Sequence, residues 1–135
     1  QAAEAAIDRS GELALFGYDI DPEAIRIATQ NAALAGVGAD ITFEQKALAD
    51  LWIDQERGIM ISNPPYGRRM AEFQEINALY ITLNKMMRKK SGWSVYILTA
   101  DEKFPGYFKR GRPDRVRKLF NGNIRVDYYQ YHGER

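Results

Sequence analysis

The sequence predicts an α/β domain with a mostly parallel sheet, and three observations support this class. Its 135 residues and ordinary apolar fraction of 45% suit one globular domain. Short apolar segments alternate with segments of helical periodicity, a pattern typical of parallel strands joined by crossover helices. The chain then closes on two apolar runs joined by Asn121-Gly122, which predicts a hairpin and hence an antiparallel terminal strand.

The first part of the chain has clear boundary signals. Residues 1–8 have the pattern of a helix end, and residues 13–18 form a short apolar strand that stops at Asp19. Asp21 is the predicted N-cap of the next helix, with proline at the first helical position. Gly36 ends that helix. Its apolar face is predicted to carry Ile25, Ala28, Thr29 and Ala32.

The remaining elements follow the same alternation. A long helix is predicted over residues 72–90, with Ser91-Gly92 as its stop. Its buried stripe consists of Ile76, Leu79, Tyr80, Leu83, Met86 and Met87. The other predicted strands cover residues 41–44, 59–61, 93–98, 116–120 and 124–129.

Composition excludes several classes of site. The chain has no cysteine, so it has no disulfide, no cysteine nucleophile and no cysteine metal site. His132 is the only histidine, which argues against a histidine metal cluster, and we expect no metal. No apolar run is long enough to span a bilayer and no signal peptide is visible, so we expect no membrane partner and a cytoplasmic location.

Polar residues follow three predicted strands at the edge where open α/β sheets bind ligands. Asp19 comes directly after the first strand, and Asp50 lies a little beyond the second. One carboxylate can accept both hydroxyls of a ribose and another can accept an exocyclic amine, so this pair suits an adenosine-bearing cofactor. Capping is the favoured role for Asp21, whereas Asp19 lies outside the cap and is the better ligand candidate. Asp50 alone is a weak signal, because surface aspartates are common.

The third strand runs into Asn63-Pro64-Pro65-Tyr66. Neither proline can donate a backbone N–H, so regular structure ends there. The Asn63 side-chain carbonyl and the Pro64 backbone carbonyl form a rigid pair of acceptors for an –NH2 group, and Tyr66 can stack on a flipped-out base. Such a corner orients a weakly nucleophilic amine. A simple strand-ending turn is the alternative, and it is sufficient for Asn-Pro alone.

The motif "NPPYG" with "GYDIDPEAIRIATQNAALAGV" upstream resembles S-adenosylmethionine-dependent amino-methyltransferases of the Rossmann-like class. The family it resembles most is that of bacterial ribosomal RNA guanine-N2 methyltransferases with an RNA-binding THUMP domain, often labelled N6-adenine-specific DNA methylases. "ISNPPYGRRM", "ILTADEKF" and "RKLFNGNIRVDYYQYHG" also fit this family, so the resemblance covers nearly the whole chain.

The resemblance implies roles for particular residues. Asp19 would bind the ribose of S-adenosylmethionine, Asp50 would lie near the adenine, and Ile20 would also contact the cofactor. Asn63, which also borders the cofactor, would hold the target amine together with its three neighbours Pro64, Pro65 and Tyr66. The family's first strand and glycine-rich loop have no counterpart, since no Gly-x-Gly precedes Asp19. We therefore expect residues 1–135 to be a partial catalytic domain that is inactive alone.

A basic segment bears on the substrate. Arg68 and Arg69 adjoin the corner, and seven further cations lie between residues 103 and 118, where acids are few: Lys103, Lys109, Arg110, Arg112, Arg115, Arg117 and Lys118. Phe104, Tyr107 and Phe108 are interleaved with them. Cations with aromatic rings suit a phosphate backbone with unstacked bases, and Arg68, Arg69, Lys109 and Arg110 are the candidate substrate-binding residues. A solvated basic loop whose aromatics belong to the core is an equal alternative.

The sequence therefore predicts a methyltransferase that modifies an exocyclic amine of an RNA base, foremost N2 of guanine in 23S ribosomal RNA. A DNA adenine-N6 methyltransferase shares the same corner. A non-catalytic RNA-binding module that keeps the fold is a second rival, favoured by the absent glycine loop. A protein glutamine methyltransferase is a third, disfavoured by the basic segment.

Overall fold

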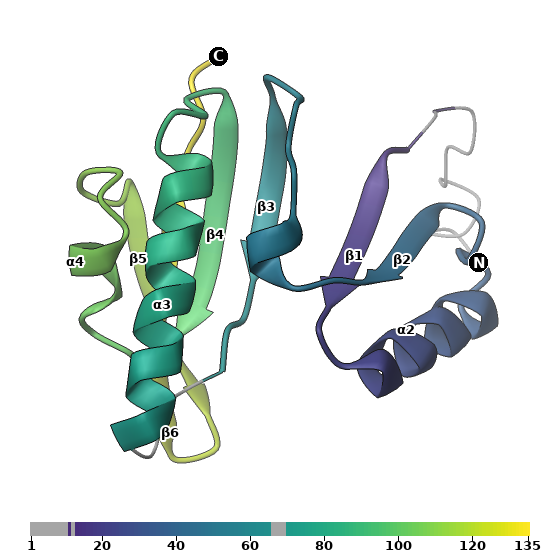
Figure 1. Cartoon of the computed structure of the whole chain (residues 1–135), viewed down its shortest axis with the longest axis horizontal. Helices are drawn as coiled ribbons and strands as arrows, with labels where there is room; N and C mark the ends of the chain where they lie inside the picture. Colours follow the sequence, from purple (N-terminus) through teal and green to yellow (C-terminus); the bar gives the residue numbers. More distant parts are fainter. Residues whose placement is uncertain (1–10, 12, 66–69) are drawn as a thin grey trace, which may run out of the picture. The chain divides into compact units, whose positions relative to one another are not determined.

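The computed structural model describes residues 11, 13–65 and 70–135. The predicted helix end at residues 1–8 lies outside them. The chain divides into two compact units, Gln1–Leu51 and Trp52–Arg135, each with its own sheet (Figure 1). No helix within the described ranges is long and apolar enough to cross a membrane.

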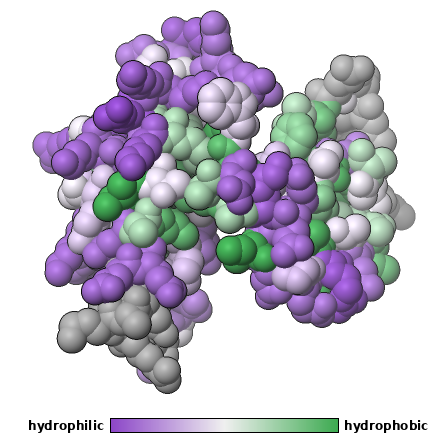
Figure 2. All heavy atoms as spheres, in the orientation of Figure 1, coloured by the Kyte–Doolittle hydropathy of each residue, from purple (hydrophilic) through white to green (hydrophobic). Residues whose placement is uncertain are grey.

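The described residues of the first unit form two parallel strands, one α-helix and one short 3₁₀ helix. Strand β1 (Leu15–Asp19) pairs with β2 (Ile41–Gln45) from Leu15 opposite Ile41 to Asp19 opposite Gln45. Helix α2 (Pro22–Leu34) connects them, and a short 3₁₀ helix, η1 (Leu48–Asp50), follows. Many apolar side chains of this unit remain exposed, among them Leu13, Leu15, Phe16, Ile20 and Leu34. Figure 2 shows hydrophobic residues, in green, on the surface of this unit.

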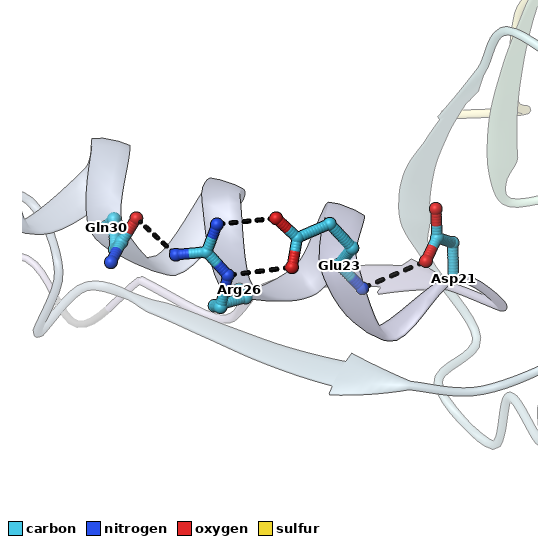
Figure 3. Close-up of polar contacts among 4 residues, drawn as sticks. All are labelled: Asp21, Glu23, Arg26 and Gln30. Carbon is cyan, nitrogen blue, oxygen red and sulfur yellow. Dashed lines mark hydrogen bonds and ion pairs between the residues drawn. The ribbon is translucent and has the colours of Figure 1, made fainter.

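Helix α2 begins as its sequence predicts. Asp21 has extended backbone geometry, and its carboxylate accepts a hydrogen bond from the backbone N–H of Glu23 at 2.9 Å (Figure 3). The ion pair with Arg26 lowers the pKa of Glu23, and Arg26 also donates to Gln30. After the helix, Gly36 has φ of +76°, which glycine adopts without a steric penalty. The capping role predicted for Asp21 is confirmed.

The second unit holds a four-stranded sheet in the order β3-β4-β6-β5. Strands β3 (Gly58–Ser62) and β4 (Trp93–Thr99) are parallel, and β6 (Ile124–Tyr131) runs antiparallel to both β4 and β5 (Arg115–Asn121). Figure 1 shows α3 (Met70–Met87) in front of this sheet, with the one-turn helix α4 (Phe104–Tyr107) beside it.

The core of this unit lies on one face of the sheet. Val95 and Ile97 of β4 are opposite Tyr131 and Tyr129 of β6, so the four side chains share a face, and all are buried. The predicted stripe of α3 supplies Ile76, Tyr80, Leu83 and Met87, each at most 4% exposed. Leu79 and Met86, predicted for the same stripe, are half-buried.

Three features of this unit differ from the sequence prediction or were not foreseen. Helix α3 begins earlier and ends earlier than predicted, at Met70 and Met87. Helix α4 was not predicted, because four residues that include a proline and a glycine are too short for a periodic signal. The terminal strand is antiparallel as predicted, and it lies between β4 and β5, a position that the sequence pattern did not indicate.

Two buried tyrosines make the free energy of unfolding depend on pH in the alkaline range. Burial raises the pKa of Tyr129 and of Tyr131 from 10 to about 12. Below pH 10 both phenols are protonated in the folded and the unfolded chain. Between pH 10 and 12 the unfolded chain loses these protons first, so the free energy of unfolding should fall as pH rises. Urea unfolding at pH 8, 10, 11 and 12 measures this slope, and Tyr131→Phe should make it shallower; an unchanged slope in that variant would contradict the assignment.

Candidate functional site

The carboxyl edge of the first unit carries three of the predicted cofactor residues. Asp19 is the last residue of β1, and Ile20 follows it with 70% of its surface exposed. Asp50 closes η1, five positions after β2 ends at Gln45. Because β1 and β2 are parallel, all three residues follow strand ends at the same edge.

Local hydrogen bonds hold the turn after β1. The Oδ1 atom of Asp19 accepts from the backbone N–H of Asp21 at 2.9 Å. The Gln45 side chain donates to the carbonyl of Ile20 at 3.1 Å, and the backbone N–H of Lys46 donates to the carbonyl of Asp19 at 2.9 Å. The Oδ2 atom of Asp19 has no hydrogen-bond partner within the described part of the chain. Asp19 thus presents an exposed acceptor, whereas Asp21 uses its carboxylate on the helix.

Lys46 places a positive charge near the acidic residues of this edge. Its hydrogen bond to Glu44 raises the pKa of Lys46 most, and the charges of Tyr18 and Asp50 add to the effect. The ammonium lies 3.0 Å from the carboxylate of Glu44 and 5.7 Å from the centre of the Tyr18 ring. The edge therefore offers carboxylates, one neighbouring cation and an exposed apolar side chain, a mixture that fits a nucleoside with a ribose diol.

The second unit carries the proline corner at its own carboxyl edge. Asn63 directly follows β3, Pro64 is buried, and Asn63 and Pro65 are exposed. A buried ring anchors the corner while its neighbours face outward. The rest of the predicted corner, Tyr66, and the adjoining Arg68 and Arg69 lie outside the described residues.

The end of β4 lies beside the end of β3, since Ser62 is opposite Ile97. Thr99, fully buried there, forms a 2.9 Å hydrogen bond with the hydroxyl of Tyr80 and accepts from the backbone N–H of Asp101 at 3.1 Å. These contacts brace the loop that follows β4. Sequence reasoning did not single out Thr99, because its partner comes from a helix 19 positions earlier in the chain.

An ion-pair network near the same edge was also missed. Asp127 is 6% exposed and accepts two hydrogen bonds at 3.1 Å from Arg125, whose guanidinium also lies 3.8 Å from Glu102. A buried carboxylate is tolerated only with such a partner. The one sequence signal was an aspartate inside the otherwise apolar run "VDYY".

The candidate substrate cations have different environments. Lys109 is exposed, and its backbone N–H donates to the Asn84 side chain at 3.0 Å. The guanidinium of Arg110 donates to the carbonyl of Ser91 at 3.2 Å, and burial lowers the pKa of Arg110. Phe104 and Phe108 are fully buried and stacked, with ring centroids 5.4 Å apart. These two rings therefore belong to the core, as in the alternative interpretation of a solvated basic loop with core aromatics.

Residues 1–130 match the family described as "RMKL-like, methyltransferase domain". The chain is 40% identical over 119 residues to "Putative RNA methyltransferase YpsC" of Bacillus subtilis, covering 88% of this chain and 31% of that protein. It is 36% identical over 115 residues to "Ribosomal RNA large subunit methyltransferase K/L" of Syntrophotalea carbinolica, covering 82% of this chain and 16% of the relative. The chain thus spans less than a third of either relative.

A solved structure agrees over the whole chain. The crystal structure of SMU.472 complexed with SAH matches with a TM-score of 0.89 and 34% identity, covering 99% of this chain and 35% of that one. SAH is what S-adenosylmethionine becomes after it has given up its methyl group. The fold is therefore Rossmann-like, of the S-adenosylmethionine-dependent type.

Proposed function

Because this chain belongs to the RMKL-like methyltransferase domain family, a family of S-adenosylmethionine-dependent RNA methyltransferases, we propose that it is part of an enzyme that methylates an exocyclic amine in RNA. We further propose N2 of guanine in 23S ribosomal RNA as the target. The similarity to the Syntrophotalea relative, which is named a large-subunit ribosomal RNA methyltransferase, supports the RNA class. A ribosomal RNA substrate also implies the cytoplasm as the place of reaction.

One observation carries the proposal: an exposed asparagine directly after a parallel strand, followed by a buried proline. The Asn63 side-chain oxygen and the Pro64 carbonyl oxygen would accept the two N–H bonds of the target amine. Tyr66 would stack on the base, and Pro65 would hold the backbone of the corner. This grip leaves the nitrogen lone pair free to face the methyl donor, and positioning of this kind supplies much of an enzymatic rate.

The first unit fits the cofactor at its carboxyl edge. Asp19 would bind the ribose hydroxyls through its exposed carboxylate, and Ile20 would cover one face of the adenine. Asp50 would accept from the adenine amine. When bound, S-adenosylmethionine supplies an electrophilic methyl group. A new N–C bond then forms as the S–C bond breaks, and the amine proton leaves to water.

Because the chain spans less than a third of these relatives, the proposal is tested on the full-length protein that contains it. We would incubate that protein with labelled S-adenosylmethionine and unmodified ribosomal RNA, then digest the RNA and identify the labelled nucleoside. N2-methylguanosine is the expected product. N6-methyladenosine in RNA would contradict the guanine target, and label found only on DNA or protein would contradict the RNA class.

Two neighbouring aspartates give a matched test of the cofactor edge. Asp19→Ala should weaken S-adenosylmethionine binding by about 10- to 100-fold, since a carboxylate–hydroxyl pair is a charge-assisted hydrogen bond. Asp21→Ala should lower the free energy of unfolding by about 1 kcal/mol through loss of the cap, with little change in affinity. Isothermal titration calorimetry and urea unfolding measure the two quantities. Equal affinity losses in both variants would contradict the separate roles.

A further inference from the structure

Strand β5 and the loop before it form a basic surface at the edge of the second unit's sheet. The sheet order places β5 last, and all seven of its residues are exposed. Five exposed cations lie on this strand and the loop, and we call them the basic edge: Lys109, Arg112, Arg115, Arg117 and Lys118.

The cations of the basic edge form no ion pair with the described residues of the chain. The ion pairs of the described residues involve Arg26, Lys46 and Arg125, and none of them uses a cation of the basic edge. Asp114 is the one acid between residues 103 and 126. Its carboxylate accepts from the backbone N–H of His132 at 2.7 Å, and its charge favours the protonated form of Arg110.

The three cations of β5 project from both faces of the strand. Arg115 and Arg117 project from the same face of β5, opposite Gln130 and Tyr128 of β6, while Lys118 projects from the other face. Arg112 and Arg115 also line an open depression together with Pro113, Asp114 and Tyr129. Phe120, 72% exposed on the same strand, adds an aromatic surface on which a base can stack.

We propose that the basic edge is a docking surface for the phosphate backbone of the RNA substrate. This inference rests on the proposed function and adds a second place of contact, separate from the amine-binding corner. Guanidinium groups bind phosphate through paired hydrogen bonds, and a strand with cations on both faces can follow a flexible backbone. Lysine and arginine on an edge strand also deter sheet-to-sheet aggregation, and that role alone predicts no RNA affinity.

Salt dependence separates the two roles. In the full-length protein, binding of a ribosomal RNA fragment is measured by fluorescence anisotropy between 50 and 200 mM KCl. Loss of two phosphate contacts should reduce the slope of log K against log salt by about 1.4, at about 0.7 per contact for single strands. Arg115→Gln/Arg117→Gln should therefore bind about 25-fold more weakly near 0.1 M salt. Arg115→Lys/Arg117→Lys should keep most of the slope, since the charges remain.

A matched control is provided by a second pair of exposed cations on the same unit. Arg88 and Lys89 are exposed just after α3, and Arg88→Gln/Lys89→Gln removes the same charge elsewhere. The proposal requires that this control bind RNA like the unaltered protein and that all variants unfold at similar temperatures. Equal losses in both glutamine pairs, or no loss in the first, would overturn it. Methyl transfer by the unaltered protein is scored separately, so failure of the enzyme activity is distinguishable from failure of the docking surface.

Discussion

Replacing Asn63 with alanine should lower methyl transfer by the full-length protein at least about 100-fold, because the change removes one of two acceptors that hold the amine. Asn63 is exposed at the end of β3, so the change creates no core cavity. The loss should appear in kcat more than in the KM for RNA, since the amine is a small part of the bound surface. Single-turnover transfer from labelled S-adenosylmethionine measures it.

Two controls distinguish this role from damage to the fold. Asn63→Asp keeps an acceptor oxygen at the same position and should retain more activity than the alanine variant. Pro65→Ala changes the backbone of the same corner without touching either acceptor, and should cost less than Asn63→Ala. Full methyl transfer by a folded Asn63→Ala protein would refute the proposed amine grip.

Replacing Phe104 with alanine should lower the free energy of unfolding by about 3–5 kcal/mol, the usual cost of removing a buried aromatic side chain. Its ring is fully buried. The ring centroid lies 4.9 Å from that of Tyr80 and 5.4 Å from those of Phe108 and Tyr129. Few neighbours can collapse into that space, because helix α3 and strand β6 contribute large rings of their own. Urea unfolding measures the loss.

The same variant tests which role Phe104 has in the basic segment. Phe104→Leu should recover most of the stability, since it refills much of the volume. RNA affinity of the folded fraction should be unchanged in both variants, as the ring is not exposed. A stability change below about 1 kcal/mol, or a large loss of RNA affinity in a fully folded protein, would contradict the core assignment.

Local signals in the sequence were sufficient for most elements. The N-cap at Asp21, the glycine after α2 and the terminal hairpin each depend on neighbours within four positions, and the structure has all three. The two-residue loop of the hairpin is Gly122-Asn123 rather than the predicted Asn121-Gly122, because Asn121 pairs with Ile124 as the last residue of β5. The buried stripe of α3 followed from helical spacing alone, which placed Ile76, Tyr80, Leu83 and Met87 correctly. The resemblance carried by "NPPYG" also led to a family that the comparisons show.

Side-chain partnerships between distant elements were not accessible in that way. The Tyr80–Thr99 hydrogen bond depends on how α3 lies against β4, and the contact of Glu102 with the Arg125–Asp127 pair depends on β6 lying next to β4. Neither residue spacing nor composition shows that the terminal strand inserts between β4 and β5. The burial of Phe104 and Phe108 likewise depends on how α4 packs near α3.

The sequence by itself determined the order of the strands and of the two long helices, the cap of α2 and the chemical character of the two carboxyl edges, because these depend on short-range sterics and on residue type. Tertiary structure alone decided which rings are buried, which cations stay exposed on β5 and that Glu102 lies beside the Arg125–Asp127 ion pair. These properties arise from contacts between segments far apart in the chain, and burial converts the same side chain from a solvated group into a core group.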